Sequence, residues 1–172
     1  LLDNICPYID VDCLTNYNLG LLVSGNSNFI PPTPGAILEV LEYHKVDLNG
    51  KHIVIVGPGT LIGRPLANLL MHEKVTLTVC SSGTKNLGKF TKQADIVIAG
   101  VGKYNLIKGS MLKRGAIAID AGVCFEGAKM CGDVDLKSVS RVASIVTPTP
   151  GGVGPITVAK LLENTIISAK KL

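Results

Sequence analysis

The sequence predicts an α/β fold built on a doubly wound, mostly parallel sheet. From residue 52 onward, short apolar runs alternate with helical patterns, as expected when helices cross over between parallel strands. Hydrophobic residues make up 47% of the chain and aromatic residues only 4%. The core must therefore consist mainly of Val, Ile, Leu and Ala, as in sheets that helices cover on both faces.

Each element is expected where the local pattern indicates it. Residues 1–32 carry recurring Pro, Asn, Gly and Ser and are expected to be irregular. Thr33 suits the N-cap of a helix over 33–43, with Pro34 at its first position. The other elements are strands at 53–56, 75–79, 95–99, 116–120 and 143–146 and helices at 66–70, 87–92 and 155–170, the last opening on Pro155.

A glycine turn follows the first of these strands. Gly57, Gly59 and Gly63 form a G-x-G-x-x-x-G pattern, one residue longer than the usual dinucleotide pattern. Glycine allows the backbone to approach a pyrophosphate closely, and the following helix N-terminus supplies N–H donors. We interpret the segment as the dinucleotide-binding turn of a Rossmann-like sheet, with an ordinary strand-to-helix turn as the alternative.

The end of the second strand favours one dinucleotide over another. NAD sites carry an Asp or Glu about 20 residues after the glycine turn, where it binds the ribose hydroxyls. Here residues 80–85 offer hydroxyls, including Ser82 and Thr84, together with Lys85, and no carboxylate. A 2′-phosphate would not be repelled, so NADP is the expected cofactor and NAD the second choice. A polar loop without a ligand is the alternative.

Three further segments lie where ligands bind in such sheets, beyond the carboxyl ends of strands. Residues 100–102 and 120–123 contain glycines that allow close backbone approach, although turns with unusual φ angles explain them equally well. Residues 147–157 hold three prolines and three glycines and open the last helix. We interpret this segment as a rigid ligand loop with exposed N–H groups.

Composition argues against several other classes of function. The net charge is +4 without a basic run or stripe, so nucleic acid is not expected as a partner. The five cysteines are odd in number and lack a C-x-x-C pair, so neither a disulfide framework nor a metal site is expected. No apolar run is long enough for a membrane span, and no signal peptide is visible. Asp10 and Asp12 alternate on an extended segment, where a solvated pair is the default interpretation.

Several motifs together resemble one known family. They are residues 10–12 (Asp-Val-Asp), 18–25, 29–34, the glycine turn at 57–63, 132–135 (Gly-Asp-Val-Asp), the loop at 147–157 and 163–165 (Glu-Asn-Thr), in this order and at these spacings. Over essentially its whole length, the chain resembles the bifunctional methylenetetrahydrofolate dehydrogenase/methenyltetrahydrofolate cyclohydrolases. The Thr-Pro-x-Pro-Gly-Gly-Val-Gly-Pro-x-Thr loop is highly specific to that family.

The resemblance implies an activity and partners. Members of the family oxidise methylenetetrahydrofolate by hydride transfer to NADP, sometimes NAD, and then hydrolyse the methenyl product to formyltetrahydrofolate. One-carbon derivatives of tetrahydrofolate are therefore the implied ligands. The resemblance also implies a homodimer formed through the cofactor domain, a role in purine biosynthesis, and a location in the cytoplasm or the mitochondrial matrix.

The resemblance also implies roles for individual residues. Asp12 would hold the pterin side of the folate and is the expected carboxylate of the catalytic site. The implied cofactor-binding residues are Gly57, Pro58, Gly59, Ser82, Thr84, Gly102, Val123 and Thr157. The other implied substrate-binding residues are Pro150, Gly151, Gly152 and Pro155. The chain departs from the family at Cys13, where Gly is usual, at Pro58-Gly59, where Arg-Ser or Ala-Ser is frequent, and at Ser81, where His is frequent.

The implied organisation has three parts. Residues 1–32 are a remnant of a second, N-terminal α/β catalytic domain; 33–154 form the NADP-binding domain with a connecting helix at 33–43; and 155–172 return to the catalytic domain. The family's catalytic Lys follows a Tyr by four residues, upstream of the Asp-Val-Asp motif, and this chain is expected to lack that segment. Tyr104 and Lys108 have the same spacing but lie in an ordinary loop of the cofactor domain.

Three hypotheses of function remain at this point. The favoured one is the larger C-terminal part of the folate enzyme. A non-catalytic dinucleotide-binding module or subunit is the alternative from a different class, and it predicts binding without turnover. A different dehydrogenase, acting on amino or hydroxy acids, is the third, and the loop at 147–157 argues against it. The apolar surface of residues 1–32 further predicts self-association.

Overall fold

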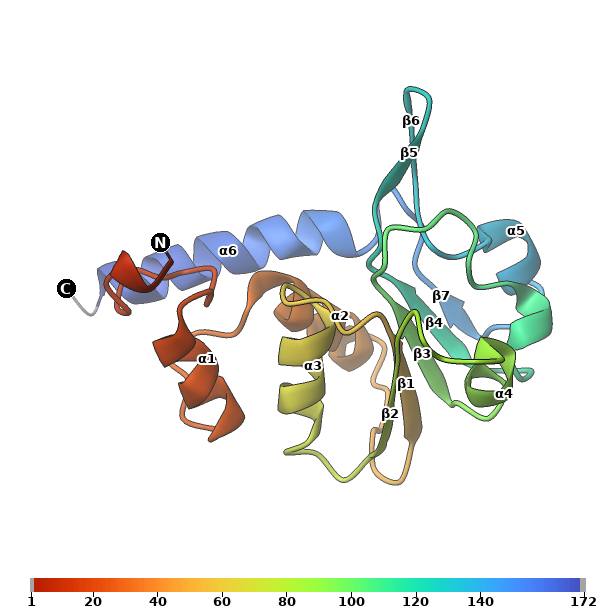
Figure 1. The fold of residues 1–172 in the computed structure, drawn as a ribbon, viewed down its shortest axis with the longest axis horizontal. Helices are drawn as coiled ribbons and strands as arrows, with labels where there is room; N and C mark the ends of the chain where they lie inside the picture. Colours follow the sequence, from red (N-terminus) through yellow and green to blue (C-terminus); the bar gives the residue numbers. More distant parts are fainter. Residues whose placement is uncertain (1, 171–172) are drawn as a thin grey trace.

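The computed structural model describes residues 2–170 and is built around one five-stranded sheet (Figure 1). The strands are His52–Val56 (β1), Thr76–Cys80 (β2), Ile96–Ala99 (β3), Ile117–Asp120 (β4) and Ile145–Val146 (β7). Their spatial order is β2-β1-β3-β4-β7, and every neighbouring pair runs parallel. The chain moves from β1 to one side at β2 and then to the other side at β3, so the topological switch point lies between β1 and β3.

Helices cover both faces of the sheet. On one face lie α2 (Pro32–Tyr43), α3 (Gly63–Leu70) and α6 (Val153–Ala169); on the other lie α4 (Leu87–Thr91), α5 (Leu136–Val139) and the 3-10 turn η2 (Gly109–Met111). Successive strand residues point to opposite faces, so Ile53 and Ile55 of β1 pack against the first set, and Val54 and Val56 against the second. The predicted doubly wound α/β architecture is therefore confirmed.

All five strands differ from their predicted bounds: β1 begins one residue earlier, β3 and β4 begin one residue later, and β2 and β7 differ more. β2 begins and ends one residue later than predicted, because Cys80 pairs with Val56 at the end of β1. β7 comprises only the last two residues of the predicted 143–146. The N–H of Ala143 donates to the carbonyl of Val139 at the end of α5, so the β ladder starts later along the chain.

A β-hairpin that the sequence analysis did not predict projects from the body of the molecule (Figure 1). β5 (Cys124–Glu126) pairs antiparallel with β6 (Lys129–Cys131). The turn contains Gly127 at φ +62°. Phe125 and Met130 form a cross-strand pair that is exposed, although Cys131 is buried, and the sequence shows no alternation of apolar and polar residues.

The expectation of an irregular segment at 1–32 is wrong in part. The segment contains a 3-10 turn, η1 (Leu2–Asn4), and a helix, α1 (Asn16–Val23), whose N-cap Thr15 accepts the N–H of Asn18 at 3.2 Å. Asn and Gly lower intrinsic helix propensity, so α1 depends on burial of Asn18 and Leu22 and on its contact with α3. Residues 1, 171 and 172 of the expected terminal segments lie outside the described residues.

Three helices begin earlier than predicted, among them α3, which begins at Gly63 instead of residue 66. α2 begins at Pro32 with Pro31 as N-cap, so Thr33 is not the cap and Pro34 takes the third position. α6 begins at Val153, so Pro155 takes the third position instead of the first. The first N–H groups of a helix have no intrahelical acceptor, and proline therefore costs no hydrogen bond anywhere in the first turn.

The N-terminal segment is tied to the far end of the chain. Asn164 Nδ2 of α6 donates to the carbonyl oxygens of Val11 and Ile30, both at 2.8 Å. One turn further along α6, Ser168 Oγ donates to the carbonyl oxygen of Tyr8 at 2.7 Å. Figure 1 accordingly shows the start of the described N-terminal segment beside the C-terminal part of α6. These bonds fix residues 8–11 against α6, the helix that follows β7 and is the last element of the described chain.

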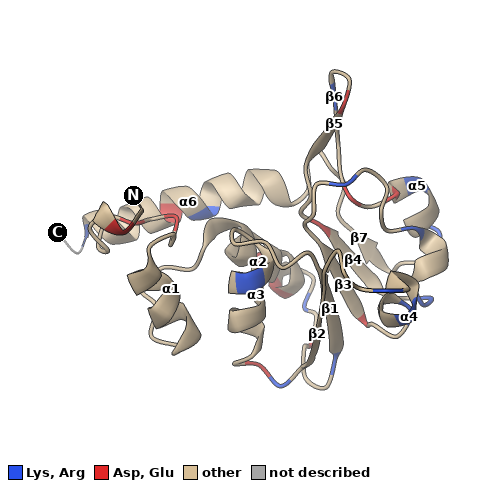
Figure 2. Ribbon diagram, viewed as in Figure 1, with Lys and Arg blue, Asp and Glu red and all other residues tan. Residues whose placement is uncertain are grey.

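Apolar side chains nevertheless remain exposed on this segment. Tyr8, Ile9, Tyr17 and Val23 are each at least 50% exposed. Figure 2 shows that α1 carries no charged residue. Self-association of the chain through this surface stays a prediction.

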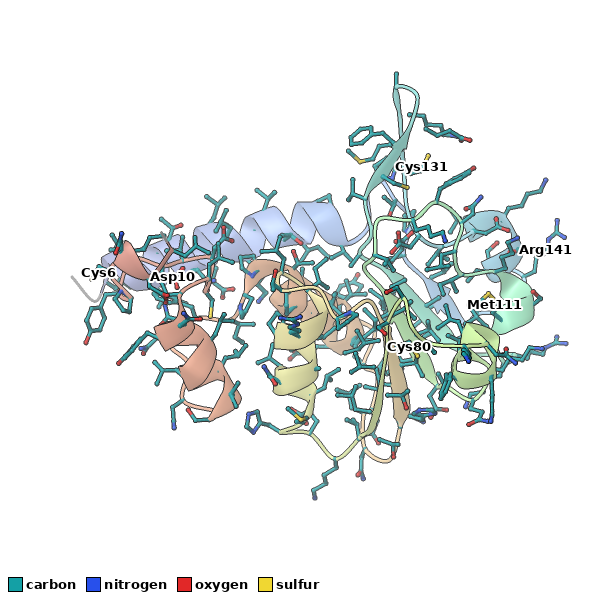
Figure 3. The ribbon with its side chains drawn as sticks, viewed as in Figure 1. Cys6, Asp10, Cys80, Met111, Cys131 and Arg141 are labelled. Carbon is teal, nitrogen blue, oxygen red and sulfur yellow. The ribbon has the colours of Figure 1, made fainter. Side chains whose placement is uncertain are left out.

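Asp10 organises the turn before α1. Its carboxylate accepts the N–H groups of Leu14 and Thr15 and the side-chain Nδ2 of Asn18, each at 2.9 Å (Figure 3). Burial opposes ionisation, but these donors outweigh burial, and the pKa of Asp10 is lowered. Asp12 is exposed whereas Asp10 is buried, so the two side chains point in different directions as expected. The segment is a turn, however, and not the expected extended segment.

Replacing Asp10 with Asn is expected to lower the free energy of unfolding by about 1–3 kcal/mol, because the amide turns a donor toward backbone N–H groups. The loss should be greatest at neutral pH. A carboxylate with a lowered pKa stabilises the fold above its ordinary pKa, and this contribution disappears as the pH falls through the lowered value.

Urea unfolding at about pH 7 and about pH 3 measures both effects. The matched control is Asp12→Asn, which alters an exposed carboxylate and should change stability by less than about 0.5 kcal/mol. Equal losses in the two variants would contradict the role of Asp10.

Candidate functional site

A cavity of about 600 Å³ opens at the carboxyl edge of the sheet. The turns that follow β3, β4 and β7 wall it, together with the first turn of α6. Its lining comprises residues 100–102, 120–123 and 148–155 with Thr33, Ile62, Met130 and Thr157. Ligands of doubly wound sheets bind at this edge, and the volume is within the range of small-molecule sites.

The proline- and glycine-rich loop at 147–157 forms one wall of this cavity. Thr147 Oγ1 accepts the N–H of Asp120 at 2.8 Å, which anchors the loop to β4. A Cβ on Gly152 would lie 2.4 Å from the Pro148 carbonyl oxygen, so the loop is packed tightly against itself. In addition to Asp12, the resemblance assigns four residues to substrate binding, and all four line this cavity: Pro150, Gly151, Gly152 and Pro155.

A smaller cavity of about 130 Å³ adjoins the first, since Thr33 and Thr157 line both. Asp12 lines the smaller cavity with its exposed carboxylate. Thr60 and Leu61, from the turn after β1, also line it. The N-terminal segment, the glycine turn and α6 thus meet at one place, although they lie far apart in the chain.

The turn after β1 requires glycine at two positions. Gly57 has φ +103°, and its N–H donates to the carbonyl oxygen of Cys80 at 2.9 Å. α3 starts so close to this turn that a Cβ on Gly63 would lie 1.9 Å from the Gly57 carbonyl oxygen. Gly59 is exposed, and a Cβ there would meet nothing within 4 Å. The turn therefore leaves open space at the start of α3.

The loop after β2 presents hydroxyl groups and no carboxylate. Ser82 is exposed, and Thr84 Oγ1 accepts the N–H of Ser81 at 2.9 Å, which closes the loop. Lys85 follows and is also exposed. Figure 3 labels Cys80, the buried last residue of β2, from which this loop departs. A phosphate at this place would meet no negative charge from residues 81–85.

The cofactor residues implied by the resemblance fall into two groups. Those that line the 600 Å³ cavity are Gly102, Val123 and Thr157. Those outside the linings of both cavities, at the ends of β1 and β2, are Gly57, Pro58, Gly59, Ser82 and Thr84. The sequence analysis missed two residues of the lining, Ile62 and Met130. Met130 comes from the unpredicted hairpin, and only the fold brings it to the cavity.

Cys13 has the backbone conformation that favours glycine, the residue usual in the family at this position. Its φ is +58°, in the left-handed region that costs a non-glycine residue about 1–2 kcal/mol. The side chain is buried. Burial, with the negative charge of Asp10, raises the pKa of the Cys13 thiol to about 11. Cys13 is therefore protonated at neutral pH and acts as a packed side chain, not as a nucleophile.

Other reactive groups lie away from the two cavities. Tyr104 and Lys108, which share the Tyr-x-x-x-Lys spacing, are exposed between β3 and η2 and line neither cavity. Within residues 2–170, no group of three or more His, Cys, Asp or Glu side chains is arranged to hold a metal ion. No helix in the same range has the length and apolar character of a membrane span.

Sequence comparison finds relatives over nearly the whole chain. Residues 31–172 match the tetrahydrofolate dehydrogenase/cyclohydrolase NAD(P)-binding domain. The chain is similar to the bifunctional protein FolD of Caldanaerobacter subterraneus subsp. tengcongensis, with 49% identity over 168 residues that cover 98% of this chain and 60% of that protein. The chain thus spans about 60% of the length of the curated relatives that it matches.

Solved structures agree with the sequence comparison. A FolD methylenetetrahydrofolate dehydrogenase/cyclohydrolase from Campylobacter jejuni superposes with a TM-score of 0.95 at 43% identity, covering 99% of this chain and 61% of that one. The Trypanosoma brucei enzyme, solved with NADP cofactor and inhibitor, gives a TM-score of 0.93 at 36% identity over the same shares of the two chains.

Replacing Gly63 with Ala is expected to destabilise the fold by about 1–3 kcal/mol, because the new Cβ must displace backbone atoms of the preceding turn. Gly59→Ala adds the same atom into open space and should stay within about 0.5 kcal/mol of the parent chain. Urea unfolding of the two variants measures the difference. A Gly63→Ala chain that unfolds like the parent would show that α3 does not approach the turn this closely.

Proposed function

Because the chain belongs to the tetrahydrofolate dehydrogenase/cyclohydrolase family, we propose that it forms the NADP-binding part of a bifunctional enzyme. That enzyme oxidises methylenetetrahydrofolate and hydrolyses the methenyl product to formyltetrahydrofolate. The observation that carries the proposal is the pair of adjoining cavities, one at the strand ends and one lined by Asp12, with Thr33 and Thr157 common to both. A dinucleotide and a folate that exchange a hydride must meet at such a junction.

The residues present fit a dinucleotide laid along the carboxyl edge. The pyrophosphate would lie at the start of α3, where Gly59 leaves space beside the positive end of the helix. The N–H of Arg64 donates to the carbonyl oxygen of Gly59 at 3.0 Å and Pro65 has no N–H, so Gly63 would be the donor from the first turn. Ser82 and Thr84 would surround the 2′-phosphate, and Gly102 and Val123 the nicotinamide end. When bound, NADP supplies the hydride acceptor. An NADP-containing relative, the Trypanosoma brucei enzyme, supports this assignment.

The folate would occupy the junction between the two cavities. Asp12 offers an exposed carboxylate that accepts N–H groups of a pterin-like ring, and it is the residue we assign to the catalytic site. Pro150, Gly151, Gly152 and Pro155 would cover the ring from the loop at 147–157 and exclude water from it.

The remaining proposals follow from family membership. We propose the division into 1–32 as part of a folate-binding catalytic domain, 33–154 as the NADP-binding domain, and 155–172 as the segment returning to the catalytic domain. We also propose a homodimer, a location in the cytoplasm, and a role in supplying one-carbon units for purine biosynthesis. Sedimentation of the purified chain tests the homodimer.

Introducing a negative charge at Ser82 tests the cofactor assignment. Ser82→Asp is expected to weaken NADP⁺ binding at least about tenfold, through repulsion of the 2′-phosphate, and to affect NAD⁺ much less. Isothermal titration calorimetry with both dinucleotides measures the ratio. Ser110→Asp, which adds the same charge on exposed η2, is the control and should leave both affinities unchanged. Equal losses for NADP⁺ and NAD⁺ would contradict the assignment.

The folate assignment is tested by following methenyltetrahydrofolate formation from methylenetetrahydrofolate with NADP⁺ and NAD⁺ in parallel. The assay is run on this chain and on the full product of its gene. We expect NADP⁺ to be preferred, and Asp12→Asn to lower kcat/KM at least about tenfold while leaving the Kd for NADP⁺ unchanged. The control Asp47→Asn alters an exposed carboxylate remote from both cavities. Turnover of a hydroxy or amino acid without any response to folate would overturn the proposal.

A further inference from the structure

Two buried carboxylates lie beneath the 600 Å³ cavity. Asp120, the last residue of β4, is 2% exposed and contributes to the lining, and Asp133, two residues after β6, is 0% exposed. None of the salt bridges found within residues 2–170 involves either of them. A buried charge is costly unless hydrogen bonds stabilise it, so the partners of these two side chains determine how this part of the site is built.

Asp133 holds the loop that follows β3. One carboxylate oxygen accepts the N–H of Val101 and the other accepts the N–H of Lys103, each at 2.5 Å. The two donors flank Gly102, which has φ +74° and lines the cavity. Charge-assisted hydrogen bonds of this kind are short and strong. The carboxylate therefore fixes the loop in one arrangement from below, without itself reaching the cavity.

Asp120 holds Asp133 in turn. Its Oδ1 accepts the N–H groups of Gly122 and Asp133, both at 3.1 Å, and its Oδ2 accepts the N–H of Val134 at 3.0 Å. Burial raises the pKa of Asp120 against the effect of these donors, and the negative charge of Asp133 adds to the increase. The two carboxylates thus connect the end of β4, the segment that follows β6 and the turn after β3.

Two glycines make room for the carboxylates. A Cβ on Gly122 would lie 2.2 Å from Asp133 Cγ, and a Cβ on Gly132 would lie 1.9 Å from Asp120 Oδ2. The backbone therefore approaches both carboxylates more closely than any side chain would allow. Figure 3 labels Cys131 at the base of the hairpin, directly before this crowded segment.

The loop held by Asp133 lies on one side of the topological switch point. The glycine turn and the Ser82 loop are at the ends of β1 and β2, whereas residues 100–102 are at the end of β3, the first strand beyond the switch point. Gly100 also lies against the glycine turn, since a Cβ on Gly57 would be 3.0 Å from its carbonyl oxygen. A dinucleotide that crosses the switch point has its adenosine half on the first side and its nicotinamide half on the second. Residues 100–102 would therefore border the pyrophosphate at the glycine turn and the nicotinamide half beyond it, whereas an adenosine half at the end of β2 would not reach them.

We propose that Asp133 is a positioning residue for the nicotinamide half of the cofactor, acting through the backbone of residues 101–103. The proposal rests on the proposed function, because it takes NADP as the ligand. Asp133 does not line the cavity and would not contact the ligand directly. Removing the carboxylate releases the N–H groups of Val101 and Lys103, and the loop then loses the arrangement against which the nicotinamide half binds.

The test compares a whole dinucleotide with its adenosine half. NADP⁺ and adenosine 2′,5′-bisphosphate are titrated by calorimetry into the parent chain, Asp133→Asn and Asp135→Asn. In Asp133→Asn, the Kd for NADP⁺ should rise at least about tenfold, while the Kd for the bisphosphate stays within about twofold. The control Asp135→Asn changes a neighbouring carboxylate that caps α5, where Asn also serves as a cap, and should leave both constants unchanged.

A second variant leaves both carboxylates in place. Gly102→Ala strains the loop, because its φ is positive and the new Cβ would lie 3.1 Å from the Val123 carbonyl oxygen. It should reproduce the same split between the two ligands if the arrangement of this loop controls binding of the nicotinamide half. If Asp133→Asn does not fold, Asp133→Glu, which keeps the carboxylate but moves it by one methylene, takes its place and should show the same split. Equal weakening of both ligands, or no weakening of either, would overturn the positioning role. Failure of the parent chain to bind either ligand would instead overturn the proposed function and the inference with it.

Discussion

Parallel strands that are apolar along their whole length must be covered on both faces, and this requirement determines where the rest of the molecule lies. β3 illustrates it, since each of its four residues is at most 1% exposed. Covering both faces requires helical crossovers, and crossovers bring the carboxyl end of every strand to the same edge. The turns after β1, β3, β4 and β7 therefore meet there. The glycines, hydroxyls and carboxylates of the site gather at that edge while the interior stays aliphatic.

The parts of the fold that could be predicted are those with a local signal. The apolar runs of β1 and β3 and the glycine pattern at 57–63 indicate strand, turn and helix without knowledge of the rest of the chain. α1 could not be predicted, because its Asn and Gly residues disfavour helix and its stability comes from Asn18 and Leu22 buried in the tertiary structure. The hairpin at 124–131 could not be predicted either, because its apolar pair, Phe125 and Met130, is exposed and its sequence has no apolar alternation.

The residues of the site also fall into those with a local sequence signal and those without one. Asp12 and the loop at 147–157 are recognisable from motifs, and the structure places both beside the cavities. The linkage between Asp120 and Asp133 has no such signature. The two residues are 13 positions apart, and each of the hydrogen bonds that their carboxylates accept comes from a backbone N–H. Every residue except proline has a backbone N–H, so the type of the donating residue gives no signal in the sequence. Only the coordinates show that Asp133 reaches back 32 positions to Val101.

The hydrogen bonds that tie the N-terminal segment to α6 have a consequence for biosynthesis. Asn164 and Val11 are separated by 153 positions, and Ser168 and Tyr8 by 160. A ribosome adds about 5–20 residues per second, so the N-terminal segment waits roughly 8–32 seconds before its partner helix has been made. The strands of the sheet are all translated within that interval and are available to assemble first. Residues 8–11 are thus translated well before α6 and can dock only after this helix has been made.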